Sequence, residues 1–333
     1  MCIGLFLLVV ALPLHDYPLL TPTKIDLINE GMTAMLNGRW DQAYALFLNL
    51  HKIDTADPAG YLFRASVRQA EMIDREASLY GRELTHLLDS VVLQARGKMM
   101  SCSPRDSAIC FLYIGHQFAY RSLWEARFGS KLAALSNGMK AKGQYQSGLR
   151  ADSTLYDLYL GLGTYHYWKS VRSGILRTVG IFKNEKEKGI AEIRMALDSS
   201  LFSRDAAFSE LIWIMLGEKN FDSAAVLAGH MLARFPEGNT FRWPLAESHF
   251  RSKRYGDAAR EYRKIFNRVS KEPGNYYNVI EAAYWLCLAL DKTGRRDQAD
   301  EILDYLDSVY DDIPKDIRRK QRSKLWRLQR RGR

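Results

Sequence analysis

Apolar residues recur every three or four positions along almost the whole chain, with polar residues between them. This spacing is typical of amphipathic α-helices, and no stretch shows the alternation of β-branched and polar residues that marks a half-buried strand. The pattern therefore predicts an all-α protein. The expected helices cover about residues 24–37, 41–53, 59–80, 82–100, 106–127, 131–150, 155–171, 185–198, 204–217, 222–234, 239–252, 257–270, 276–292, 297–310 and 315–330.

Glycine and proline mark the boundaries between these segments. A glycine supplies the left-handed residue that ends many helices, and a proline cannot continue one. Asp41, Asp222 and Asp297 directly follow a turn, where a carboxylate can cap the N–H groups of the next helix. The expected breaks fall at Gly38, Pro58, Pro104, Gly129, Gly217, Pro236, Pro273 and Gly294.

A short motif recurs where one predicted helix gives way to the next. Residues 38–43 (Gly-Arg-Trp-Asp-Gln-Ala) and 294–299 (Gly-Arg-Arg-Asp-Gln-Ala) are nearly identical, and looser copies end at Ala224 and Ala258. These two alanines lie 34 residues apart. A helix-turn-helix signature with that period indicates an array of stacked helix pairs.

The repeat resembles the tetratricopeptide repeat family, whose unit is also 34 residues long. In the unit that starts at residue 239, the family pattern is matched by Leu245, Ala246, Tyr255, Ala258 and Tyr262. Further units start at residues 24, 205 and 280. The resemblance implies an all-α solenoid of stacked helix-turn-helix repeats that forms a right-handed superhelix. The small alanine would let paired helices approach closely, and the aromatic residues would fill the wedge between units.

The middle of the chain departs from this pattern. Leu162, Gly163 and His166 open a unit whose second small residue, Gly189, arrives late, after an insertion. The stretch 155–196 is similar to an irregular tetratricopeptide family found in bacteria and eukaryotes. We therefore expect three segments: an apolar signal-like or anchor segment over 1–20, a solenoid over 21–314 that is irregular between about 59 and 204, and a basic helix or tail over 315–333.

The resemblance also implies a binding surface. In tetratricopeptide proteins, side chains of the first helix in each unit line a concave groove that holds a protein or peptide. The corresponding residues here are Tyr167, Trp168, Ser209, Trp213, Trp243, Glu247, Phe250, Arg251, Tyr284 and Lys292. Several are aromatic residues or arginine, the types that anchor interfaces. A non-catalytic scaffold is the function that this set favours, although many of the same side chains could instead pack against the 169–190 insertion or the neighbouring unit.

The formal net charge of +10 comes almost entirely from the C-terminal tail. Residues 315–333 hold ten Lys or Arg and one acid, so the rest of the chain is nearly neutral and is not a general polyanion binder. Three interpretations stay open: a capping helix with solvated charge, a helix on an anionic membrane, and a contact with nucleic acid or an acidic protein. The basic side chains in question are Arg318, Arg319, Lys320, Arg322, Lys324, Arg327, Arg330 and Arg331.

The N-terminal residues bear on localisation. The apolar run 3–12 is too short to span a bilayer but suits the centre of a secretion signal, although no basic residue precedes it. We expect an exported or envelope-associated, periplasmic protein, with a cytoplasmic one as the alternative. An envelope tether held by the N-terminus and the tail is a second functional hypothesis. Cys102 and Cys110 flank a turn and would form either a disulfide or two half-buried thiols.

Catalytic motifs are missing from the sequence. It contains no dinucleotide or phosphate-binding glycine loop, no paired metal-binding histidines and no nucleophile elbow. Glu185 and Glu187 alternate with lysines, which is typical of a solvated charged face. We expect no cofactor, no metal site and no small-molecule substrate. A third hypothesis, an enzyme with a site near His166, rests only on that residue's aromatic surroundings.

Overall fold

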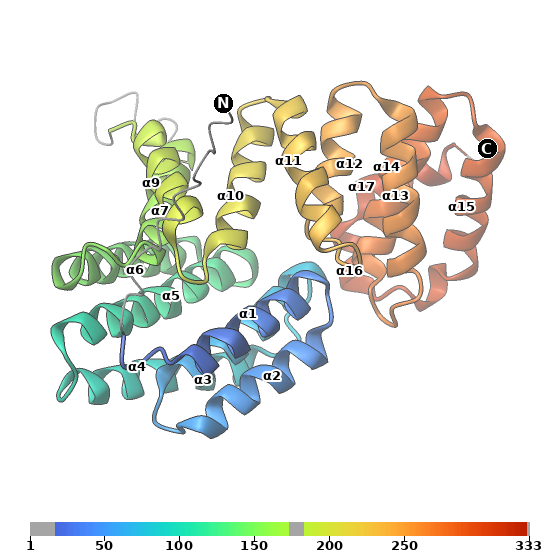
Figure 1. Ribbon diagram of the computed structural model, residues 1–333. Helices are drawn as coiled ribbons and strands as arrows, with labels where there is room; N and C mark the ends of the chain where they lie inside the picture. Colours follow the sequence, from blue (N-terminus) through green and yellow to red (C-terminus); the bar gives the residue numbers. More distant parts are fainter. Residues whose placement is uncertain (1–16, 173–182, 332–333) are drawn as a thin grey trace, which may run out of the picture.

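The computed structural model describes residues 17–172 and 183–331, and these residues fold entirely into helices and their connections (Figure 1). The helices are α1 (Pro22–Leu36), α2 (Trp40–Ile53), α3 (Pro58–Asp74), α4 (Gly81–Met99), α5 (Pro104–Phe128), α6 (Lys131–Ala151), α7 (Asp157–Arg172), α9 (Lys186–Ser199), α10 (Arg204–Gly217), α11 (Phe221–Arg234), α12 (Arg242–Arg251), α13 (Tyr255–Val269), α14 (Tyr276–Lys292), α15 (Arg296–Ser308), the 3-10 helix η1 (Tyr310–Asp312), α16 (Lys315–Lys320) and α17 (Arg322–Gln329).

Successive helices pack against each other in hairpins, which makes the chain an α-solenoid. The predicted all-α solenoid is confirmed, and most helix boundaries lie within three residues of those expected. Two expectations were wrong in detail. The helix expected over 59–80 ends at Asp74, where Glu76 takes a left-handed backbone with φ of 50°. The helix expected over 315–330 is two short helices that meet at Gln321.

The repeated motif forms the same turn four times. Gly38 and Gly294 have φ of 71°, and the looser copies place Lys219 and Lys253 in the same left-handed region, at 63° and 61°. After each of these residues, the next backbone N–H donates to a carbonyl five residues earlier, as in Arg39 N to Ala34 O at 2.9 Å. This bond satisfies a carbonyl at the helix end. A glycine makes the turn without strain, whereas lysine adopts it at some cost.

The small residue of the motif lies at the contact between paired helices. Ala43, Ala224, Ala258 and Ala299 are all fully buried. In the irregular middle, Gly163 of α7 and Gly189 of α9 take over this role. A Cβ atom added to Gly163 would lie 2.5 Å from the carbonyl oxygen of Gly189, so the two backbones are in direct contact. The late small residue of this unit therefore has the packing role that the sequence predicts.

The solenoid closes on itself, because the turn between α1 and α2 packs on the connection between α11 and α12 (Figure 1). The backbone N–H of Glu237 donates to Asn37 Oδ1 at 3.2 Å, although the two residues are 200 positions apart. Arg268 of α13 donates to the carbonyl of Asn37 at 3.3 Å. The side-chain amide of Asn278 on α14 donates to the carbonyl of Asp74. The side chain and carbonyl of Asn37 after α1, and the carbonyl of Asp74 at the end of α3, thus fasten the N-terminal units to the C-terminal ones.

The closure contains one titratable group of note. Burial, with a smaller contribution from the nearby Glu272, raises the pKa of the Asp74 carboxyl to about 6. Arg268 and Arg75 oppose this shift. Because the folded state holds this proton more tightly than the unfolded chain, the contribution to stability is complete below about pH 4 and is lost as the pH rises through about 6.

We therefore expect Asp74→Asn to be more stable than the wild type at pH 8, by up to about 3 kcal/mol, and equal to it near pH 4. The neutral amide keeps the shape of the side chain and removes the buried charge. Urea unfolding of both proteins at the two pH values measures the difference. Asp198→Asn, an exposed replacement on α9, is the control and should change neither value. Equal stability of Asp74→Asn and wild type at pH 8 would contradict the prediction.

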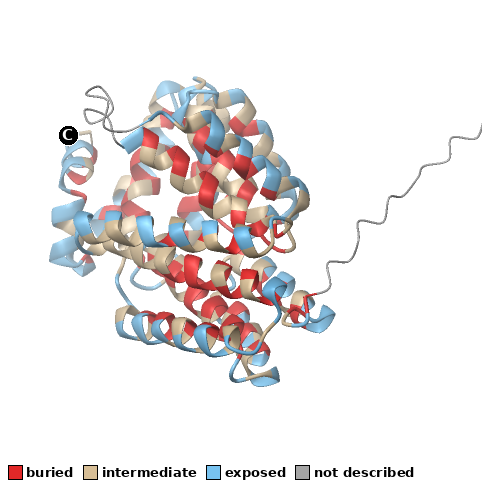
Figure 2. Ribbon diagram, turned by 90° about the vertical axis from the view of Figure 1, so that its left-hand side faces the viewer, coloured by how far each residue is buried: buried red, intermediate tan, exposed pale blue. Residues whose placement is uncertain are grey.

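Aromatic side chains fill the N-terminal core. Phe63 packs on Phe47, on Tyr113 and on Phe202, with ring centroids 5.2, 6.4 and 5.7 Å apart. Phe202 precedes α10, so this core also joins distant parts of the chain. Figure 2 shows buried residues on the facing sides of the helices and exposed ones outside. Tyr17 and Leu20 are buried in the same core, so the end of the expected segment 1–20 belongs to the folded body. Residues 1–16 of that segment lie outside the described residues.

Candidate binding surface on the first helices of the pairs

The predicted groove residues lie on α7, α10, α12 and α14, the first helices of four successive pairs. On α10 and α12 they recur at three- or four-residue spacing and therefore share one side of each helix, which we call the groove face. Their accessibility differs widely. The exposed members are Trp213, Arg251 and Lys292, the half-buried members are Trp168, Ser209, Trp243, Glu247 and Phe250, and the buried members are Tyr167 and Tyr284.

Trp213 is the most accessible aromatic residue of the predicted groove. Its side chain is 39% exposed, and Ser209 lies one turn before it on α10. An indole that keeps this much surface in water gains by being covered, because burying apolar area is favourable at about 25 cal/mol per Å². Tryptophan is also among the residues that contribute most to binding when a partner encloses them.

The neighbouring helix α12 adds two half-buried aromatic side chains that are held in place by rings on α13 and α14. Trp243 packs edge-on against Tyr262, with ring centroids 6.1 Å apart. Phe250 packs against Tyr255 at 5.3 Å and against Trp285 at 5.1 Å. Trp285 in turn stacks on Tyr262 at 6.3 Å. These contacts fix the exposed edges of Trp243 and Phe250 before any partner arrives.

Polar groups surround these rings. Arg251 pairs with Glu247 on the next turn of α12, at 3.2 Å. The indole N–H of Trp285 donates to Glu281 at 2.9 Å. Burial raises the pKa of the Tyr262 hydroxyl, and the nearby carboxylates of Glu247 and Glu281 raise it further. The surface of α12 thus combines aromatic edges with an ion pair that can exchange partners.

The groove face ends at α14 because α17 covers it. Arg327 donates to the hydroxyl of Tyr284 at 2.7 Å, and Gln321 donates to Glu281 at 3.0 Å. Lys324 pairs with Glu281, and Arg331 pairs with Asp291. Tyr284 is therefore buried beneath the chain's own C-terminal helix and does not lie on an open surface. Lys292, one residue beyond the covered stretch, remains exposed.

The side chains of α7 are likewise used inside the molecule. Tyr167 is 1% exposed and donates its hydroxyl to Glu218 at 2.8 Å. The indole N–H of Trp168 donates to Glu210 of α10, and burial raises the pKa of that carboxyl. Both aromatic residues join α7 to α10. Of the predicted groove, α10 and α12 therefore carry the accessible part.

His166, the basis of the enzyme hypothesis, forms a buried pair. Its Nδ1 lies 2.6 Å from Glu192 Oε2, and the histidine is 1% exposed. The half-buried Glu185 pairs with Lys169, and its backbone N–H donates to the Ser170 hydroxyl at 2.8 Å. These bonds tie α9 to α7. In the described part of the chain, no three His, Cys, Asp or Glu side chains are grouped so that they could hold a metal ion.

The C-terminal tail has two differently used sides. Gln321, Leu325 and Leu328 are buried against α14 and α15, which is the apolar stripe expected of a capping helix. Arg319, Lys320, Arg322, Arg327 and Arg330 are exposed, whereas Arg318, Lys324 and Arg331 are half-buried. Trp326 is 54% exposed among them.

Cys102 and Cys110 are free thiols. Cys110 is buried, and burial raises the pKa of its thiol to about 12, so the thiol is neutral near pH 7. Of the two interpretations that the sequence left open, the structure contains the reduced pair.

Comparisons with known proteins do not identify the chain. No protein-family model matches it, and no curated protein matches it.

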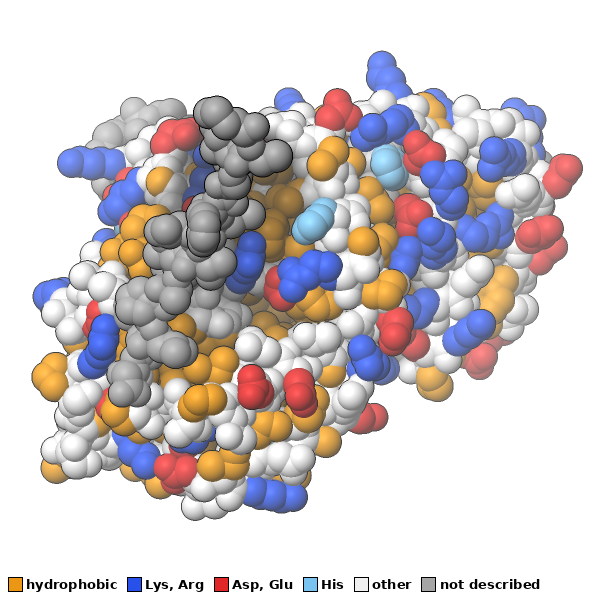
Figure 3. All heavy atoms as spheres, in the orientation of Figure 1, with side chains coloured by type: hydrophobic (Ala, Val, Ile, Leu, Met, Phe, Trp, Pro, Cys, Tyr) orange, Lys and Arg blue, Asp and Glu red, His pale blue; other side chains and the backbone are white. Residues whose placement is uncertain are grey.

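None of the helices in residues 17–172 and 183–331 is both long and apolar enough to cross a membrane. The face drawn in Figure 3 mixes Lys and Arg with Asp and Glu over the C-terminal units, and hydrophobic side chains are visible in the hollow beside α10.

Proposed function

We propose that this chain is a non-catalytic scaffold of the tetratricopeptide type that binds a segment of a partner protein on the groove faces of α10 and α12. The observation that carries the proposal is the exposed indole of Trp213 on α10, together with the half-buried Trp243 and Phe250 on α12, the first helix of the next pair. The four equivalent turns and the buried alanine of each motif support the resemblance to that repeat family.

The mechanism is burial of preformed aromatic anchors. Trp243 and Phe250 already pack on Tyr262 and Trp285, so their side chains lose little freedom on binding. This preorganisation preserves affinity, because ordering a mobile side chain at an interface costs about 0.5–1.5 kcal/mol. The Glu247–Arg251 pair lies at the edge of the aromatic group and can bond charged or polar groups of the partner.

The chemistry of the surface limits the partner. Two helices, α10 and α12, offer the accessible anchors, and α17 already occupies the face of α14. We therefore propose a short helical or extended segment with two or three apolar side chains and a charge near one end. A long peptide running the full length of the array is not the partner that this geometry supports.

The test is binding of the partner, first captured by crosslinking in native cells and identified by mass spectrometry, and then titrated as a purified peptide. We expect Trp213→Ala to weaken binding by at least about tenfold, since a central tryptophan contributes about 2 kcal/mol or more. Trp243→Ala should weaken binding by a similar factor. Helicity, followed by circular dichroism, should stay unchanged for Trp213→Ala because its side chain lies at the surface.

Val226→Ala is the matched control, because Val226 is 75% exposed on the second helix α11, outside the groove face. It should bind as tightly as the wild type. If Trp213→Ala and Val226→Ala both bind with wild-type affinity, the partner uses another surface and the proposal fails.

A further inference from the structure

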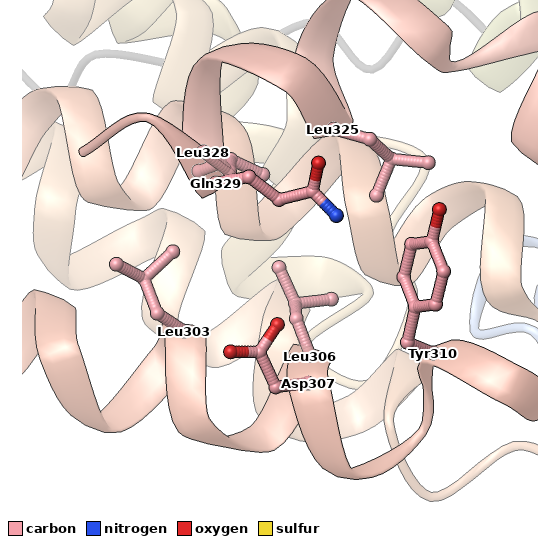
Figure 4. A pocket seen from close by; sticks show the side chains of 7 residues that line it. All are labelled: Leu303, Leu306, Asp307, Tyr310, Leu325, Leu328 and Gln329. Atoms are coloured by element: carbon pink, nitrogen blue, oxygen red, sulfur yellow. The ribbon is translucent and has the colours of Figure 1, made fainter. Parts of the chain in front are cut away.

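A second surface lies at the C-terminal end of the solenoid, where the array stops. A pocket of about 290 Å³ opens between α15 and α17 (Figure 4). Its lining residues are Leu303, Leu306, Asp307, Tyr310, Leu325, Leu328 and Gln329. Leucines from both helices form the apolar floor, and Tyr310 lies at the end of the pocket toward Leu325 in this view.

One bank of this pocket is acidic. On α15, Asp300, Asp304 and Asp307 are exposed and follow each other at helical spacing beside Leu303. Residues 296–312 contain seven acids and one basic residue, Arg296. The helix therefore presents a row of carboxylates along the edge of the apolar floor.

The other bank is basic and contains an exposed aromatic side chain. Arg322 and Trp326 of α17 and Arg330, which caps its C-terminal end, follow each other at four-residue spacing on the solvent side of Leu325. The guanidinium of Arg330 lies over the Trp326 ring, 4.7 Å from its centroid. Residues 315–331 contain nine basic residues and one acid, Asp316. Adjacent helices thus carry opposite charge on either side of one groove.

These two banks do not neutralise each other. Among the described residues, no ion pair joins α15 or η1 to α16 or α17. The basic residues that do form ion pairs at this end are Lys324 of α17 and Arg331 just after it, and both reach back to α14. Asp304, Asp307 and Arg322 have no ion-pair partner within the described part of the chain. Their charges are open to a second molecule.

We propose that this groove binds the same groove of a second copy of the chain, related by a twofold axis that runs along it. Such a rotation places the acidic α15 of one copy opposite the basic α17 of the other, twice in one interface. It also brings the two leucine floors together and encloses both copies of Trp326. A self-complementary patch is the requirement for a closed twofold dimer. An unrelated partner would need both charges in the same arrangement, whereas a second copy has them by symmetry.

Charge reversal of one bank at a time tests the proposal by sedimentation velocity on the full chain. We expect the wild type to dimerise at micromolar concentration and the dimer to weaken as the salt concentration rises. Asp304→Lys with Asp307→Lys leaves two basic banks, and Arg322→Glu with Arg330→Glu leaves two acidic banks. Each double variant should dimerise at least about tenfold more weakly than the wild type, because like charges then face each other.

Mixing the two double variants distinguishes this interface from a loss of folding. In the mixture, each bank again faces its opposite, so a heterodimer should form although neither variant dimerises alone. The matched controls reverse exposed charges elsewhere: Asp198→Lys with Glu187→Lys, and Arg96→Glu with Arg194→Glu, which should dimerise as the wild type does. A wild type that stays monomeric even when its concentration is raised a hundredfold above the micromolar range overturns the proposal. So does binding of α17 to anionic phosphatidylserine vesicles without self-association, or a mixture that remains monomeric.

Discussion

Asp157→Ala is expected to lower the free energy of unfolding by at least about 3 kcal/mol, because it leaves several buried backbone N–H groups without an acceptor. Asp157 is fully buried at the start of α7. Its carboxyl oxygens accept from the N–H groups of Leu201, Phe202 and Ser203 at 2.8, 3.2 and 3.0 Å, and from the Ser203 hydroxyl at 2.6 Å.

The effect should reach beyond these bonds. The loop that Asp157 holds carries Phe202, whose ring packs on Phe63 of α3. One carboxylate therefore fixes the direction in which α10 leaves α9 and attaches that loop to the N-terminal core. Denaturant unfolding followed by circular dichroism measures the loss. Protease cleavage near residue 202 should also become faster, since the loop would open more often.

Two further variants separate this cause from a general loss of charge. Asp157→Asn keeps one acceptor oxygen for Phe202 and Ser203 but places an N–H donor against that of Leu201, so we expect an intermediate loss. Asp205→Ala removes an aspartate from the first turn of α10 that pairs with Arg234 at the surface, and it should cost less than about 1 kcal/mol. Equal losses for Asp157→Ala and Asp205→Ala would contradict the explanation.

The architecture could be predicted because its determinants are local. Helical spacing of apolar residues identifies each helix, and the repeated Gly-x-x-Asp-x-Ala turn places a left-handed residue and a small residue at fixed positions. Both properties act within one helix pair. Gly38 and Gly294 illustrate this, since their turns have the same φ although most of the chain separates them.

The closure of the solenoid could not be predicted in the same way. It depends on single polar bonds between distant residues, such as Asn37 with Glu237 and Asp74 with Asn278. These residues belong to no periodic pattern, and each looks like an ordinary polar residue of a turn or a helix end. The relevant information is the overall curvature of the array, which sums small rotations over many pairs.

The candidate site shows the same division. Helical position placed Trp213 and Trp243 on one face, but it could not show that α17 covers Tyr284 or that Tyr167 bonds to Glu218. Trp285 was missed, since it follows Tyr284 and falls outside the positions that the family pattern assigns to the groove. Residue spacing identifies the side chains that share one face of a helix. Whether another helix covers that face depends on tertiary contacts between distant segments. The apolar stripe of the tail, with Leu325 and Leu328, was the one signal that a helix would be packed there.

Gly163→Val is the second large effect that we expect, a destabilisation of about 3 kcal/mol. A Cβ atom at this position would meet the carbonyl oxygen of Gly189 at 2.5 Å and the backbone N of Ile193 at 2.9 Å. Both obstacles are main-chain atoms, which cannot rotate away as a side chain does, so α7 and α9 must separate. Overpacking at such a contact costs about 1–3 kcal/mol even where side chains can adjust. Urea unfolding gives the change in stability.

Gly143→Ala provides the matched control for this prediction, because Gly143 also lies inside a helix, α6, but its added Cβ would meet no atom within 4 Å beyond the nearby backbone of its own helix. There the methyl group only restricts the unfolded chain, and we expect stability to increase by about 0.5–1 kcal/mol. Opposite signs for the two substitutions would separate backbone contact from helix propensity. If Gly163→Val instead matches Gly143→Ala, the two helices do not touch through their glycines, and the irregular pair is held together by other contacts, such as the bond between His166 and Glu192 and the pairing of Glu185 with Lys169.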